Sequence, residues 1–306
     1  MFNILGGGFS LYQVLWFFLL YSFIGWCSEV IFKSVSTGKF VNRGFLNGPV
    51  CPIYGFGAVA VVLLLHPVQQ NLFFLFVGSV LVTSVLELIT GYVLNVLFHT
   101  KWWDYSEKPL NIGGYICLQF SLVWGLACVL LIRVIHPLID GFVQIIPRTI
   151  GQVLLLVAMA ILLADVIVTV AAITKLNRSL GAITEIANSI HKRSDKLAES
   201  IGNTAISAAD RINLEEQRQK LTTQLDESKG RVMAAVDEGH EKLNSALDSL
   251  KASRISRRLL KAFPNMQNRQ HGKALEELKK RLAATTKPGK PNANNQSPPT
   301  EEQNKQ

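Results

Sequence analysis

The 306 residues carry 31 Lys and Arg against 22 Asp and Glu, a formal net charge of +9, and 49% of them are hydrophobic. These averages hide two unlike parts. Up to Ile173 the chain has seven bases and six acids, whereas the part after Ile173, here called the tail, has 24 bases and 16 acids. All five Trp and all six Tyr precede the tail. One ordinary soluble globule is therefore excluded, as is a basic nucleic-acid-binding domain as the main body.

Five apolar segments of the first part are long enough to cross a membrane. A bilayer core of roughly 30 Å requires about 20 mostly apolar residues, and lipid leaves backbone polar groups without partners unless the segment is helical. The expected spans cover residues 11–32, 48–65, 72–98, 115–135 and 150–173. The sequence thus predicts an all-α polytopic membrane protein with a five-helix transmembrane domain at residues 1–173.

The connections between these spans predict the orientation. Residues 33–47 carry three bases and no acid, residues 99–111 carry two bases, and residues 66–71 carry no formal charge. The tail begins with Lys175 and Arg178. Because cytoplasmic loops are enriched in Lys and Arg, we expect the N-terminus outside and the tail in the cytoplasm. The first span has no basic region before it, so we interpret it as a retained signal anchor.

The cysteines do not indicate a metal or disulfide site. Cys27, Cys51, Cys117 and Cys128 all lie in or beside expected spans, and none forms a CxxC pair or a Cys/His cluster with metal spacing. We therefore expect buried thiols, no metal and no cofactor. The pair Trp102 and Trp103, just after the third span, is typical of an interfacial aromatic belt.

Three acids fall inside expected spans, where a charge is costly and usually marks a bundle interior, a cavity or a paired site. They are Glu29, Glu87 and Asp165, each in the cytoplasmic half of its helix. Together they predict one polar cavity open to the cytoplasm. Two alternatives remain: Glu29 pairs with Lys33 one helical turn away, and Asp165 makes a structural bond to a neighbouring helix.

Both cytoplasmic loops contain candidate site residues. Residues 42–57 hold four Gly and two Pro, which favours either a re-entrant entrance to the second span or an interfacial turn before a proline-initiated helix. The second loop combines aromatic and charged groups, which indicates a gate, a docking face or simple membrane anchoring. The candidates are Arg43, Asn47, Pro49, Cys51, Pro52 and Tyr54 in the first loop, and Trp102, Trp103, Asp104 and Tyr105 in the second.

These segments together resemble the CmpB-type family of ABC-transporter permeases, small bacterial membrane proteins found mainly in Gram-positive species. The matching residues are Gly25-Trp26 with Glu29, residues 40–49 and 51–55, Leu86-Glu87 with Thr90, residues 102–106, Cys117-Leu118 with Trp124-Gly125, and residues 258–265 and 274–279 of the tail. The resemblance implies a multi-pass protein of the bacterial plasma membrane. The sequence departs from the family at Tyr115, where many relatives have arginine, so no ion pair is transferred to that position.

The tail has a helical composition. Residues 174–263 predict a long helix or coiled coil, with apolar residues at Leu176, Leu180, Ile183, Ala187, Ile190, Leu197 and Ile201 and again at Leu225, Val232, Val236, Leu243, Ala246 and Leu250. A solvated charged helix is the alternative. Residues 264–284 predict a short amphipathic helix and residues 285–306 a disordered segment. The basic cluster Lys251, Arg254, Arg257, Arg258 and Lys261 suits either anionic lipid headgroups or a solvated helix face.

Two functions are compatible with this organisation, and a third is weaker. The first is the membrane-spanning component of a transporter, whose ATPase is a separate subunit because the chain has no GxxxxGK[ST] loop. The second is a membrane-anchored scaffold or regulator, whose tail self-associates or binds a partner helix. The third, an intramembrane enzyme using Glu29, Glu87 or Asp104, lacks a visible nucleophile or metal set, so we expect no enzyme.

Overall fold

The computed structural model describes residues 8–209 and 215–286, apart from some side chains between residues 197 and 252 and those of residues 285 and 286. It contains four helices that are long and apolar enough to cross a membrane: α1 (Leu11–Thr37), α3 (Leu72–Phe98), a bent helix over Leu118–Ile145, and the first part of α6 (Arg148–Ala209). The all-α class and the membrane character are confirmed. The predicted second span corresponds to a shorter helix, α2 (Pro52–Leu65), of 14 residues.

Local sequence signals explain where these helices begin and bend. Ser10 caps α1 in a capping box with Gln13, and Asn71 caps α3 by accepting from the amides of Phe73 and Phe74. The bent helix consists of α4 (Leu118–Leu130), a π-helical turn (Leu131–Ile135) and α5 (His136–Ile145). Pro137 is the second residue after the π turn, and a proline, which lacks an N–H, disrupts the regular hydrogen-bond ladder of a helix at such a point.

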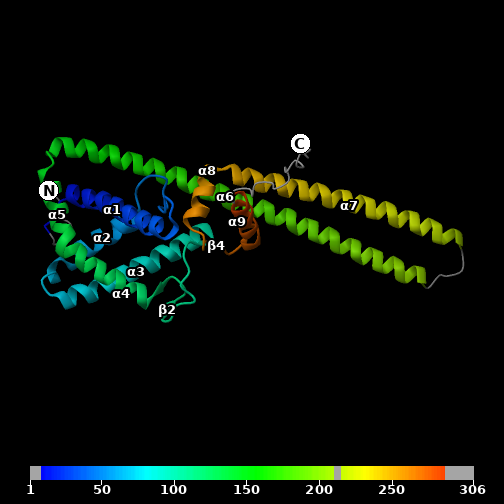
Figure 1. Ribbon diagram of the computed structural model, residues 1–306, viewed down its shortest axis with the longest axis horizontal. Coiled ribbons are helices and arrows are strands. Elements are labelled where there is room, and N and C mark those ends of the chain that lie inside the picture. The colour runs from blue at the N-terminus through cyan, green and yellow to red at the C-terminus, as the bar shows by residue number, and fades with distance from the viewer. Residues whose placement is uncertain (1–7, 210–214, 287–306) are drawn as a thin grey trace, which may run out of the picture.

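The membrane helices, here called the bundle, pack in two antiparallel pairs, α1 with α2 and α3 with α4 (Figure 1). One apolar core lies between α1, α2 and α5 and contains Phe17, Tyr21 and Val143. A second core joins α2, α3 and α4 and contains Val61, Leu75 and Cys128. Most other apolar side chains of the bundle are exposed, as expected for a surface that faces lipid.

Helix α6 leaves the bundle without a break and runs into the tail. It pairs with α7 (Glu215–Ala252), and Figure 1 shows this hairpin projecting far beyond the bundle. Its base buries Leu180 and Ile183 of α6 against Leu247 and Leu250 of α7. The predicted stripe positions Leu197, Ile201, Leu225 and Val232 lie outside the described side chains. So does the expected disordered segment 285–306, apart from the backbone of its first two residues.

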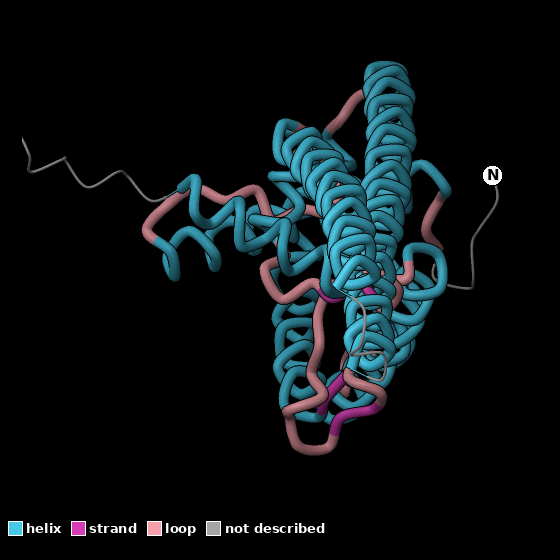
Figure 2. Tube along the Cα trace, turned by 90° about the vertical axis from the view of Figure 1, so that its right-hand side faces the viewer, coloured by secondary structure: helices cyan, strands magenta, loops and turns pink. Residues whose placement is uncertain are grey.

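After the hairpin, the chain returns to the bundle. Helix α8 (Arg254–Ala262), strand β4 (Gln267–Asn268) and helix α9 (Gly272–Thr286) pack where the bundle meets the hairpin. Strand β4 pairs antiparallel with β1 (Thr100–Lys101) of the second loop, while β2 (Asn111–Ile112) pairs with β3 (Ile116–Cys117) in a separate hairpin; Figure 2 shows the strands in magenta.

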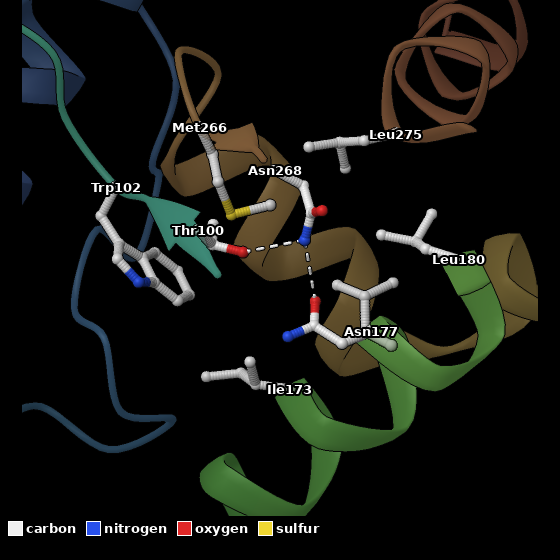
Figure 3. A pocket seen from close by; sticks show the side chains of 9 residues that line it. Thr100, Trp102, Ile173, Asn177, Leu180, Met266, Asn268 and Leu275 are labelled. Atoms are coloured by element: carbon white, nitrogen blue, oxygen red, sulfur yellow. Dashed lines mark hydrogen bonds between the residues drawn. The ribbon is translucent and has the colours of Figure 1, made fainter. Parts of the chain in front are cut away.

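The junction between bundle and tail is a closely packed apolar core. It contains Phe98 and Trp102 from the bundle side, and Leu259, Leu275 and Leu278 from the tail. A hollow of about 10 Å³ remains within it (Figure 3), where the Asn268 amide donates to Thr100 Oγ1 at 3.1 Å and to Asn177 Oδ1 at 3.3 Å. Since one water needs about 10–15 Å³, this hollow is a packing feature and not a substrate site.

Candidate functional site

The first loop, residues 38–51, turns back into the bundle instead of spreading over its surface. Gly38 ends α1 with a left-handed backbone (φ 65°), a conformation that glycine adopts without strain. The loop then runs back until the Cys51 amide donates to the Ser22 carbonyl at 2.9 Å. Ser22 lies 15 residues before the end of α1, or about 22 Å at 1.5 Å per residue. The loop is therefore re-entrant, and α2 begins at Pro52 well inside the bundle.

Asp165 of α6 holds the deepest part of this loop. Its carboxylate accepts from the Gly48 amide at 2.6 Å, from the Asn47 amide at 3.1 Å and from Asn47 Nδ2 at 2.9 Å. Thr169 Oγ1 donates to the same carboxylate at 3.2 Å. Non-helical backbone is tolerated at membrane depth only where protein or water satisfies it, and Asp165 supplies part of that satisfaction here. The predicted structural bond of Asp165 is thus made to a loop and not to a neighbouring helix.

The part of the first loop that faces the tail is held by contacts from the bundle and from the tail. Asn42 accepts from Trp26 Nε1 at 2.8 Å and donates to the Asn47 carbonyl at 2.9 Å, which closes the loop on itself. From the tail, Arg258 of α8 donates to the carbonyls of Gly44 and Phe45 at 2.7 and 2.9 Å. Burial lowers the pKa of Arg258 and nearby Asp165 opposes this shift; an arginine remains charged in either case.

Glu29 lies where α1 faces both the loop and α2. Arg43 of the loop forms an ion pair with it at 3.2 Å, and the Tyr54 hydroxyl of α2 donates to it at 2.5 Å. Tyr54 packs directly against the backbone of Gly25, where a Cβ would collide with its ring. The observed partners of Glu29 are therefore Arg43 and Tyr54, and not the Lys33 of the alternative interpretation, because the re-entrant loop brings Arg43 back against α1.

The second loop, residues 99–117, also folds back along its helices. The Tyr105 hydroxyl donates to Glu87 of α3 at 3.4 Å, and the Tyr105 ring stacks on Phe120 of α4 at 4.8 Å. Glu87 is eleven residues, or about 16 Å, from the end of α3. Its second carboxylate oxygen is buried without a hydrogen-bond partner among the described residues. Such an orphaned acceptor is costly, which makes Glu87 the least satisfied of the three acids.

Other groups shape this second loop. Trp103 Nε1 donates to the Tyr115 carbonyl at 2.8 Å, and Asn95 of α3 donates to the Tyr115 hydroxyl at 2.7 Å. Asp104 pairs with Lys101 at 3.6 Å at the loop surface. Burial alone would raise the pKa of Asp104, but hydrogen bonds from Ser106 and the charge of Lys101 lower it below its usual range. Tyr115 is thus held through both its carbonyl and its hydroxyl.

The three acids do not line one open cavity in this arrangement. Glu87 accepts from Tyr105 of the second loop, whereas Glu29 is engaged by Arg43 of the first loop and by Tyr54 of α2. Asp165 is engaged by the backbone amides of Asn47 and Gly48 in the first loop. The two inward-folded loops thus lie against these acids, where the sequence predicted one open polar cavity.

Trp102 has a different place from the one predicted. Its side chain is 6% exposed and packs edge-on against Phe45 at 5.1 Å and Phe263 at 5.0 Å. It therefore lies in the junction with the tail and not in a lipid-facing belt, because the tail covers this end of α3.

Pro49 and Pro52 only shape the backbone at the loop and the start of α2. Sequence reasoning missed Arg258 as a loop contact, although it opens the matching stretch 258–265.

Comparison with known proteins identifies a family for this chain. The family described as "Putative ABC-transporter type IV", the CmpB-type family, matches residues 16–170, which contain both inward-folded loops and all three acids. No curated protein and no solved structure matches the chain. The matched segment is more than half of the 306 residues and contains the membrane-part motifs of the resemblance, whereas the stretches 258–265 and 274–279 of the tail lie outside it. The chain therefore belongs to the CmpB-type ABC-transporter family.

Proposed function

We propose that the chain is the membrane-spanning component of an ABC transporter in a bacterial plasma membrane and that a separate subunit supplies ATP hydrolysis. The supporting observation is the tail end of the bundle, where two inward-folded loops cover two deeply placed carboxylates, Glu29 and Glu87. Structural acids are normally fully paired, whereas an orphaned one inside a span marks a functional site. The proposal includes five spans, an external N-terminus, a cytoplasmic tail and no catalysis by this chain.

In this proposal the two loops act as a gate. The first loop closes over Glu29 through Arg43, and the second closes over Glu87 through Tyr105. Outward movement of both loops would expose two carboxylates to the cytoplasm, which suits a cationic or polar substrate. The gate role is favoured over direct docking of an ATPase on these loops, because Phe45 and Trp102 are already packed against the tail.

The conservative variant Glu87→Gln tests this role. It keeps the shape of the side chain and removes the charge, so we expect loss of the transport-dependent phenotype with normal membrane insertion. Asp140→Asn is the matched control, because Asp140 lies at the far end of the bundle, where it accepts hydrogen bonds from the Gln13 and Gln144 side-chain amides. Full activity of Glu87→Gln would exclude a role of this carboxylate in transport.

Unbiased copurification of the full chain addresses the subunit composition. A transporter component retains an ATPase in stoichiometric amounts, whereas repeated recovery without any ATPase argues against the proposal. A protease-sensitive tag at the N-terminus checks the orientation, since we expect cleavage from outside intact cells.

The second candidate function is a membrane-anchored scaffold, favoured by the long α6–α7 hairpin (Figure 1). Deleting the whole tail would not test it, because α8 and β4 contact both loops. A sharper variant replaces residues 192–237 with a short Gly-Asn turn, which keeps the junction. If this variant loses function while Glu87→Gln retains it, the scaffold role is correct and the transport role is not.

A further inference from the structure

We propose that the exposed basic face of α8 binds the anionic phospholipid headgroups of the leaflet on the tail side of the bundle. This face consists of Arg254, Arg257 and Lys261, and it is named here the basic face. The inference is independent of transport, since it depends only on how α8 lies against the bundle.

The helix is fixed at the level where the spans end. Leu259 and Leu260 of α8 share one buried core with Phe98, the last residue of α3, and with Ile173 and Leu176, where the apolar part of α6 ends. Figure 1 shows α8 crossing the long axis of the molecule at the point where bundle and hairpin meet. A helix in this position runs along the expected membrane surface and not away from it.

The rotation of α8 about its own axis is also fixed. The buried residues Leu259, Leu260 and Ala262 face the tail core, and Arg258 points to the carbonyls of the first loop, which belongs to the bundle. Arg254 and Lys261 are the i−4 and i+3 neighbours of Arg258, so they lie on the same side of the helix. The basic face therefore leans toward the membrane and cannot roll away without breaking the Arg258 contacts.

The charge pattern suits headgroups better than another protein surface. The nine residues of α8 contain four bases and no acid. Arg258 is engaged by the loop, whereas Arg254, Arg257 and Lys261 are exposed. Exposed bases at a membrane surface attract anionic lipid, and each base raises the binding constant about fivefold. The structure thereby divides the basic cluster into one loop contact and a three-residue lipid face; the side chain of Lys251 lies outside the described residues.

The test compares two triple variants of the full chain. Arg254→Gln, Arg257→Gln and Lys261→Gln remove the basic face, while Lys192→Gln, Arg193→Gln and Lys196→Gln remove the same charge from exposed positions of α6. The control positions begin 19 residues beyond Ile173, or about 28 Å along α6, which exceeds a Debye length of about 8–10 Å.

Each purified protein is mixed with equal amounts of phosphatidylglycerol and phosphatidylcholine, and the lipids that remain bound are counted by native mass spectrometry. We expect the wild type and the α6 control to prefer phosphatidylglycerol, and the α8 variant to lose this preference by more than tenfold. An equal loss in both variants, no loss in either, or retention of nucleic acid in place of lipid by the basic face would overturn the proposal.

A second measurement does not depend on affinity. A fluorophore on Arg257→Cys, in a background without the four native cysteines, should be quenched by a headgroup-attached quencher in vesicles. The same fluorophore on Arg193→Cys should respond only to a water-soluble quencher. If position 257 also responds only to the soluble quencher, α8 does not lie on the membrane. Unchanged circular dichroism of each variant confirms that the fold is retained.

Discussion

Asp165 shows how one side chain fixes a loop at membrane depth. Its carboxylate accepts from two backbone amides and two side chains, whereas an asparagine would present an NH₂ group to the same donors. We expect Asp165→Asn to lower the free energy of unfolding by about 2 kcal/mol, a typical value for hydrogen bonds to a charged group. Thermal unfolding in detergent measures this loss.

The same variant should loosen the loop locally. Cys51 is 5% exposed and follows the segment that Asp165 holds. In a background with Cys51 as the single cysteine, Asp165→Asn should accelerate its reaction with a membrane-permeant maleimide. An unchanged labelling rate would mean that other contacts hold the loop without Asp165.

Tyr105 links the second loop to Glu87 and gives a pH-dependent prediction. Burial and the charge of Glu87 raise the pKa of Tyr105 above its ordinary value of about 10. Because the pKa of Tyr105 is raised on folding, its protonated hydroxyl contributes to the free energy of unfolding. This contribution is fully present below pH 10 and is lost as the pH rises toward the pKa of Tyr105 in the folded state. Tyr105→Phe keeps the stacking on Phe120 but removes the hydroxyl donor.

We therefore expect the melting temperature of Tyr105→Phe to lie below that of the wild type by a constant amount between about pH 8 and 9. The difference should shrink above pH 10, as the wild type loses its own contribution. A difference that does not change between about pH 8 and 11 would contradict the raised pKa.

At the scale of elements, the close approach of α1 and α2 depends on glycine. A Cβ at Gly55 would collide with the Ser22 side chain and lie 2.5 Å from the Phe18 carbonyl, which is backbone and cannot move freely. At Gly57, two residues along the same helix, nothing lies within 4 Å of the added Cβ. We expect Gly55→Ala to destabilise the protein by about 1–3 kcal/mol. Gly57→Ala should be neutral or stabilising by up to about 1 kcal/mol, because alanine is the better helix former.

Arg258 connects α8 with the first loop, and its geometry distinguishes arginine from lysine. The planar guanidinium donates to two adjacent carbonyls, which a single ammonium group cannot reproduce in the same way. We expect Arg258→Lys to lower stability by about 1–2 kcal/mol and to increase proteolysis between α8 and α9. The exposed neighbour Arg257→Lys is the control and should change stability by less than about 0.5 kcal/mol. Equal behaviour of the two variants would show that the Arg258 contacts do not stabilise the junction.

On the scale of the whole molecule, the sequence predicted the helices well and the loops less well. Apolar runs predicted the third span with the bounds of α3, 72–98, because a bilayer requires a definite length of apolar helix. The second span was expected to begin at residue 48, but its helix begins at Pro52. Hydropathy cannot distinguish a re-entrant apolar loop from a helix, since both are buried, and the two prolines were the usable signal.

The site was only partly predictable for the same reason. Glu29, Glu87 and Asp165 stood out because charges are rare in spans, yet their partners Arg43, Tyr105 and Asn47 come from loops whose path depends on tertiary contacts. The contact of Arg258 with Gly44 joins residues 214 positions apart and has no local sequence signature.

The unbroken course of α6 has a mechanical consequence. From Ile173 to Ala209 the helix extends for 36 residues, or about 54 Å, while Asp165 lies about 12 Å on the other side of Ile173. With Ile173 as the fulcrum, a tilt of about 5° displaces the far tip by about 5 Å and Asp165 by about 1 Å. That smaller displacement is enough to break hydrogen bonds of 2.6–3.2 Å. A force on the far end of the hairpin would therefore be transmitted along α6 to Asp165, the carboxylate that holds the first loop in the bundle.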